Sequence, residues 1–211
     1  QFNANAAKDM RNAINELSGE GVSGFVLDLR SNPGGLLMAS VEIARQWLDE
    51  GVIVSSSTRD GVSDVKRASG RALTKAPLVV LVNEGSASAS EILSGAIQDN
   101  NRGVVVGKKT FGKGLIQSVR GLSDGSGMTV TIAKYLTPSG KDIHKQGITP
   151  DVNANLSKAQ AQRLKFEDLG TRNDPQYRVA ESELAKLLRQ NKAKPEVSFE
   201  GDVQLNVFSA N

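Results

Sequence analysis

The chain has 211 residues, no cysteine, one histidine and a formal net charge of +3. The lack of cysteine excludes thiol nucleophiles, disulfides and thiolate metal sites. The mild positive charge is spread along the chain without interleaved aromatic residues, so a nucleic-acid partner is not favoured. No apolar run approaches the roughly 20 residues that span a bilayer. No signal peptide is visible either, and because the sequence starts at Gln1 we expect any targeting segment to lie upstream of it.

Strands and helices alternate over the first half of the sequence. Apolar residues at helical spacing predict a helix from Ala6 to Leu17, which Gly19 and Gly21 end, and a second helix over 36–48. Apolar runs predict four strands, over 24–29, 52–56, 78–82 and 103–106. Strands that are buried on both faces and separated by helices indicate an α/β fold.

The pattern becomes antiparallel after residue 113. Predicted strands over 115–120 and 128–133 flank Asp124-Gly125-Ser126-Gly127, which is typical of a hairpin turn. Charged residues and glutamine become frequent from about residue 155, where Asp174-Pro175 predicts the start of a helix. Val203, Leu205 and Val207 alternate as a closing strand. We therefore expect a core over 1–154 and a C-terminal appendage, a helix and then a strand, over 155–211.

Ser88 is the first candidate for a catalytic residue. It lies in the small-residue stretch Gly85–Glu91, where the predicted strand 78–82 turns into a predicted helix. Such a turn exposes a hydroxyl and directs free N–H groups and the positive end of the helix dipole towards it. This is the geometry of an acyl-transfer nucleophile. The alternative is a capping box, since Ser88-Ala89-Ser90-Glu91 also fits the S-x-x-E pattern.

Lys113 is the candidate base for this serine, and it follows Ser88 by 25 residues. A lysine acts as a base only when neutral, which requires desolvation or a nearby positive charge. Gly112 and Gly114 allow close backbone approach, and Phe111 can supply an apolar wall. Gln117 lies where it can orient the amine if the strand bends at the glycines. The alternative is a solvent-facing loop lysine.

The remaining requirement of acyl transfer is a site for the oxyanion. The N–H of Ala89, directly after the nucleophile, is one candidate donor. Asn32-Pro33-Gly34-Gly35 ends a predicted strand and begins a helix, so Gly34 can present a second donor, although a plain strand-to-helix turn explains the same residues. His144 is the only histidine that a Ser-His-Asp triad can use, and its polar, glycine-flanked context is typical of a surface turn.

These segments together resemble the carboxyl-terminal processing, or tail-specific, serine peptidases. The similarity runs in family order over about residues 1 to 152. Residues 42–45 and 132–138 are most similar to the enzymes of cyanobacteria and chloroplasts, which process the C-terminal tail of a photosystem II reaction-centre protein. The matching segments are Leu27–Gly35, Gly85–Glu91, Thr110–Gly114 with Gln117, and Gly147–Asp151.

The resemblance implies a Ser/Lys dyad of Ser88 and Lys113, with Gln117 orienting the lysine and an oxyanion hole formed by Gly34 and Ala89. Asp99 matches a supporting position of some members, although a helix-end surface carboxylate is the simpler interpretation. The implied fold is a spiral ββα core of the Clp protease and crotonase type. No metal or organic cofactor is implied.

The implied activity is cleavage near the C-terminus of extracytoplasmic proteins, in the periplasm or the thylakoid lumen. Family members carry a PDZ domain before the core, which binds a substrate tail at its sheet edge, and we expect one in the parent protein outside this sequence. Two alternatives remain: a non-catalytic peptide-binding module with the same fold, and a crotonase-like acyl-CoA enzyme that needs no Lys113.

Overall fold

The core is built around a parallel sheet in the order β1-β4-β5-β8. The computed structural model describes residues 1–193. All residue pairings between neighbouring strands of this sheet are parallel, as the alternation of strands and helices predicts. Its strands are β1 (Phe25–Asp28), β4 (Leu78–Val82), β5 (Val104–Gly107) and β8 (Val152–Asn153).

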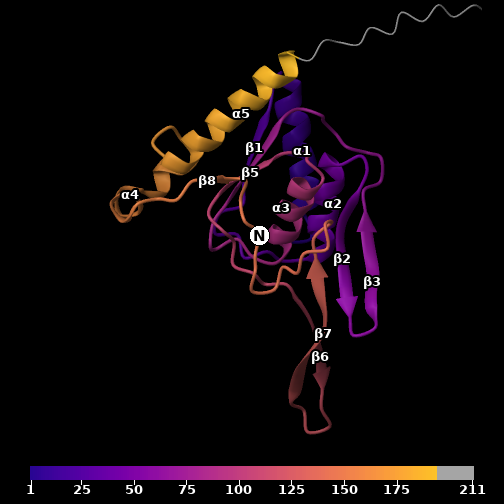
Figure 1. The fold of residues 1–211 in the computed structure, drawn as a ribbon. Coiled ribbons are helices and arrows are strands. Elements are labelled where there is room, and N and C mark those ends of the chain that lie inside the picture. The colour runs from indigo at the N-terminus through magenta and orange to yellow at the C-terminus, as the bar shows by residue number, and fades with distance from the viewer. Residues whose placement is uncertain (194–211) are drawn as a thin grey trace, which may run out of the picture.

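Helices cover both faces of the parallel sheet (Figure 1). Alternate side chains of β4 divide between two apolar clusters, with Leu78, Val80 and Val82 in one and Val79 and Leu81 in the other. Since β4 is fully buried, this alternation explains why its sequence is apolar throughout. The larger cluster contains side chains of α1 (Ala6–Gly19), α2 (Leu37–Trp47) and α3 (Ala89–Asp99), and the smaller one those of α5 (Pro175–Ala193).

A second, antiparallel sheet has the order β3-β2-β7-β6. Its strands are β2 (Val52–Thr58), β3 (Gly61–Arg67), β6 (Leu115–Gly121) and β7 (Gly127–Leu136). The hairpin of β6 and β7, predicted from its turn, projects away from the helices (Figure 1). The sequence predicts β2 as one of the alternating strands of the core, but β2 pairs with β7 about 80 residues later. It does not predict β3, because that strand is largely exposed and lacks an apolar pattern.

The segment after residue 154 packs against the core through α5. Asp174 accepts hydrogen bonds from the N–H groups of Gln176 (2.9 Å) and Tyr177 (3.2 Å), so the predicted helix start is confirmed. Asp174 also pairs with Arg30, next to the end of β1, at 2.7 Å. Two short helices precede α5: α4 (Lys158–Arg163) and the 3₁₀-helix η1 (Phe166–Asp168).

The predicted closing strand at Val203, Leu205 and Val207 lies outside the described residues. Within residues 1–193, no helix combines the length and apolar character needed to cross a membrane.

Candidate active site

Ser88 occupies a sharp turn between β4 and α3. Its backbone has φ 56° and ψ −115°, a conformation that costs a non-glycine residue about 1–3 kcal/mol and is concentrated at functional sites. Two contacts to the segment after β1 hold the turn: Ser86 Oγ donates to the Leu29 carbonyl at 2.7 Å, and Ala87 N–H donates to the Asn32 carbonyl at 3.0 Å. The structure thus contains the strand-to-helix turn that the sequence predicts, and these contacts hold Ser88 there in a strained backbone conformation.

The capping-box spacing is also present, but the Ser88 hydroxyl makes no capping hydrogen bond. The N–H of Glu91 donates instead to the Ser88 carbonyl oxygen at 2.9 Å. The reverse contact is formed, since Ser88 N–H donates to Glu91 Oε2 at 2.8 Å. Capping and a catalytic role are therefore compatible here, because the carboxylate holds the backbone and the hydroxyl is not used as a cap.

Glu91 joins the Ser88 turn to the loop that carries Lys113. The side chain is fully buried. Its Oε1 accepts from the Thr110 hydroxyl and from Gly112 N–H, both at 2.6 Å, and its Oε2 accepts from Lys113 N–H at 2.8 Å in addition to Ser88. Four donors thus surround one buried carboxylate, which is how a buried charge is tolerated. The sequence interpretation gave Glu91 only a capping role and missed this function.

The Lys113 side chain does not lie in the apolar pocket that the sequence interpretation requires. It is exposed, and Phe111, the expected wall, is 68% exposed. Gln117 is exposed as well, and no hydrogen bond joins the side chains of Ser88, Lys113 and Gln117 within residues 1–193. The expectation of a desolvated lysine is therefore wrong for this structure. The loop is held at Glu91 through the backbone N–H groups of Gly112 and Lys113, and these contacts leave the lysine side chain free to point into solvent.

The two predicted oxyanion donors lie side by side. A Cβ built on Gly34 would be 2.8 Å from the Ala89 nitrogen and 2.9 Å from Ser88 Cβ, so only glycine fits against this turn. The N–H of Ala89 has no acceptor within the described residues, whereas the N–H of Gly34 donates to Asn32 Oδ1 at 3.0 Å. The Ala89 N–H is thus free to bind an oxyanion. The Gly34 N–H can do so only after it breaks its hydrogen bond to Asn32 Oδ1.

Among residues 1–193, no hydrogen bond connects the side chain of Asp99 or of His144 to Ser88. Asp99 ends α3, about 16 Å along the helix from Ser88, and accepts from Ser139 N–H at 2.9 Å. Burial raises the pKa of Asp99, but the hydrogen bonds from Thr137 and Ser139 outweigh it, so the pKa is lowered overall. His144 lies in the predicted turn, and its Nδ1 is buried without a partner in the described part of the chain.

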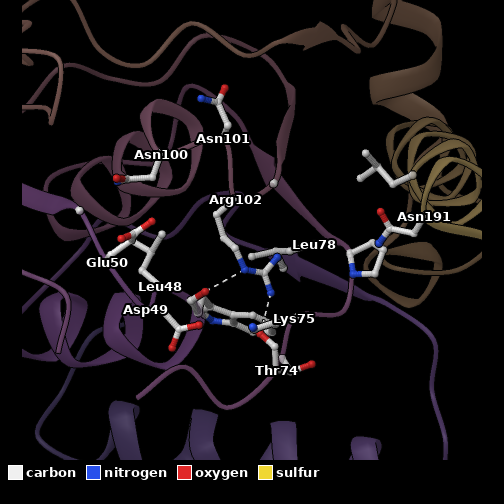
Figure 2. Close-up of a pocket in the computed structure, with 15 residues that line it drawn as sticks. Leu48, Asp49, Glu50, Thr74, Lys75, Leu78, Asn100, Asn101, Arg102 and Asn191 are labelled. Carbon is white, nitrogen blue, oxygen red and sulfur yellow. Dashed lines mark hydrogen bonds between the residues drawn. The ribbon is translucent and has the colours of Figure 1, made fainter. Parts of the chain in front are cut away.

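A pocket of about 640 Å³ lies at the opposite end of α3 from Ser88. Arg102 extends into it in Figure 2, where its dashed hydrogen bonds tie it to the surrounding backbone. Its Nε donates to the Trp47 carbonyl at 2.8 Å, and its Nη2 donates to the carbonyls of Thr74 (2.9 Å) and Ala76 (3.0 Å). The guanidinium also lies 5.6 Å from the Trp47 ring centroid. We conclude that Arg102 holds the end of α2, at Trp47, against the segment 74–76 that precedes β4.

The fold and the Ser88 turn define an α/β protein with a serine held in a strained strand-to-helix elbow. Residues 1–154 match the model of Peptidase family S41, and the chain belongs to this family. It is 52% identical over 180 residues to a carboxyl-terminal-processing protease of Synechocystis sp., covering 85% of this chain and 41% of the relative. Carboxyl-terminal-processing peptidase 3, chloroplastic, of Arabidopsis thaliana is 53% identical over 153 residues, which cover 72% of this chain and 30% of the relative.

A solved structure described as a photosystem II D1 C-terminal processing protease superposes with a TM-score of 0.70 and 51% identity. The match covers 72% of this chain and 40% of that one. The family expected from the sequence motifs is thereby confirmed, as is the α/β fold of the Clp protease and crotonase type. The chain spans less than half of the length of these relatives.

Proposed function

We propose that this chain is the catalytic core of a serine endopeptidase that cleaves near the C-terminus of extracytoplasmic proteins. The observation that carries the proposal is the strained Ser88 elbow, joined by buried Glu91 to the backbone of Lys113. Membership of the peptidase family and the names of the relatives support the same reaction. By analogy with the solved photosystem II D1 C-terminal processing protease, the precursor of a photosystem II reaction-centre protein is the substrate we favour, and the thylakoid lumen or the periplasm is the location we favour.

In the proposed reaction, Ser88 Oγ attacks the scissile carbonyl carbon and neutral Lys113 accepts its proton. The ammonium group so formed then gives this proton to the leaving nitrogen as the C–N bond breaks, and water hydrolyses the acyl-enzyme to free Ser88. The N–H groups of Ala89 and Gly34 stabilise the negative oxygen of the tetrahedral intermediate. Because Lys113 is exposed in this structure, its side chain must turn towards Ser88, where Gln117 orients the amine and bound substrate desolvates it.

The supporting parts are proposals of the same kind. The substrate is the extended C-terminal tail of a protein, and a PDZ domain of the parent protein delivers it. Arrival of the tail then completes the site by covering the lysine, which is exposed beforehand. Asp99 has no place in this proposal, because it lies at the far end of α3 and is bonded to Ser139.

Cleavage of an unstructured protein with an apolar C-terminal tail tests the proposal. We expect Ser88→Ala and Lys113→Ala each to abolish cleavage, and the matched control Lys109→Ala, an exposed lysine of the same segment, to retain it. The assay is run with and without an added N-terminal PDZ segment. Tail binding without cleavage in every form, unaffected by Ser88→Ala, would instead favour the non-catalytic peptide-binding module.

A further inference from the structure

Phe2 is tied to the Gly34–Gly35 turn by its main chain. Its N–H donates to the Gly34 carbonyl at 3.0 Å, and its own carbonyl accepts from Leu36 N–H at 2.8 Å. The two contacts form a parallel bridge between Phe2 and Gly35 outside the two sheets. The Phe2 side chain is 4% exposed and belongs to the main apolar cluster, whereas both of its neighbours in the chain are exposed. A single buried ring therefore anchors this bridge.

The Gly34–Gly35 turn lies between Phe2 on one side and Ser88 on the other. A Cβ built on Gly35 would be 2.1 Å from the Phe2 carbonyl oxygen, and one built on Gly34 would be 2.9 Å from Ser88 Cβ. Both glycines have positive φ, at 94° and 147°. Neither side of the turn has room for a side chain. Because the turn contacts both residues, a movement of Phe2 shifts the turn and so changes its contact with Ser88.

We propose that Phe2 is a positioning residue for the oxyanion site. A trans peptide is planar, so fixing the Gly34 carbonyl through Phe2 N–H fixes the plane of the Gly34–Gly35 peptide. The N–H of Gly34, the second oxyanion donor of the proposed reaction, belongs to the preceding Pro33–Gly34 peptide. The Phe2 contact therefore restrains this donor through the Gly34 Cα, where the two peptide planes meet. Donors in such a site act because they are held in place before the reaction, and a displacement of about 1 Å can lower a rate about 100-fold. The inference rests on the proposed peptidase function.

Substitution of Phe2 by glycine tests this role, with Phe2→Leu as the matched control. Glycine keeps both main-chain groups but removes the buried ring that anchors them, whereas leucine retains an apolar anchor. We expect kcat of Phe2→Gly to fall at least about 10-fold with KM nearly unchanged. Phe2→Leu should remain within about twofold of the wild type. A kcat of Phe2→Gly equal to that of the wild type would overturn the proposal.

Gly35→Ala provides a second, independent variant. Its new Cβ must displace the Phe2 carbonyl, so it disrupts the same bridge from the other side. If the two residues act through one contact, the double variant Phe2→Gly/Gly35→Ala loses no more kcat than Gly35→Ala alone. Additive losses would mean that Phe2 acts elsewhere, and the positioning role would be rejected.

Amide hydrogen exchange separates this inference from the proposed function. In the wild type, Leu36 N–H is protected by the Phe2 carbonyl, so Phe2→Gly should raise exchange at residues 34–36 and leave β4 unchanged. Faster exchange throughout the core would indicate a purely structural role and refute the positioning role. If the wild type cleaves nothing, the proposed function fails. Exchange then decides alone, and unchanged exchange at 34–36 in Phe2→Gly overturns the inference.

Discussion

Glu91→Gln should disable the active site while the protein remains folded. The carboxylate uses one oxygen for Thr110 and Gly112 and the other for Ser88 and Lys113. A glutamine has one oxygen and one NH₂ group, so the NH₂ group must face either Thr110 and Gly112 or Ser88 and Lys113, which are all donors in the wild type. The less costly orientation points the NH₂ group at Thr110, whose hydroxyl can accept from it. Gly112 N–H then has no acceptor, and the Thr110 hydroxyl, which already accepts from Ile148 N–H at 2.7 Å, loses the acceptor of its own proton.

The magnitude follows from these contacts. An unpaired buried donor costs about 1–3 kcal/mol, and each of the two remaining bonds loses about 0.5–1 kcal/mol when its acceptor becomes neutral. Relief from burying a charge offsets part of this sum. We expect a loss of about 2–3 kcal/mol in the free energy of unfolding, or a fall in Tm of about 5–10 °C for a chain of this size.

The effect on catalysis should exceed the effect on stability. Glu91 sets the distance between the Ser88 turn and the Lys113 backbone, and a shift of about 1 Å corresponds to about 100-fold in kcat. Thermal unfolding and cleavage kinetics at one temperature, well below the Tm of the variant, measure the two effects. Glu84→Gln is the control, since Glu84 is exposed and, among residues 1–193, its one salt bridge is with Lys108 at the surface. An unchanged kcat in folded Glu91→Gln would refute the reasoning.

Two further predictions concern carboxylates whose charge is stabilised by hydrogen bonds. Arg30→Met should lower the free energy of unfolding by about 3 kcal/mol, because it leaves the buried carboxylate of Asp174 without its cationic partner and with backbone N–H groups alone to balance its charge. Denaturant unfolding measures this, with the surface variant Lys108→Met expected to lose under about 1 kcal/mol, and equal losses in the two variants would contradict the prediction.

The second prediction is acid sensitivity. Burial raises the pKa of Asp174, but the hydrogen bonds from Arg30 and nearby N–H groups lower it below its ordinary value. The pKa of Asp99 is lowered in the same way. The resulting stabilisation is fully present above about pH 4 and is lost as the pH falls through the depressed values. Unfolding measured between pH 6 and pH 2 should show this loss, and a flat profile would exclude it.

Local patterns allowed much of the fold to be predicted from the sequence. The all-apolar run of β4, the hairpin of β6 and β7 and the start of α5 at Pro175 each follow from spacings of a few residues. The motifs around Ser88 also led to the family that the comparisons confirm. Such features are predictable because helix and strand periodicities and turn chemistry act between near neighbours in the chain.

Contacts between distant residues were decided by the tertiary structure alone. The sequence places Glu91 three residues after Ser88, but only the packing of α3 against the loop at 110–113 gives that carboxylate its other donors. In the same way, Arg30 and Asp174 are 144 residues apart, and Phe2 bonds to a turn more than 30 residues later. The exposure of Lys113 was also decided by the tertiary structure, since the desolvation of a side chain depends on which segments cover it. No local spacing encodes such contacts, because they form only when the whole chain has closed around its core.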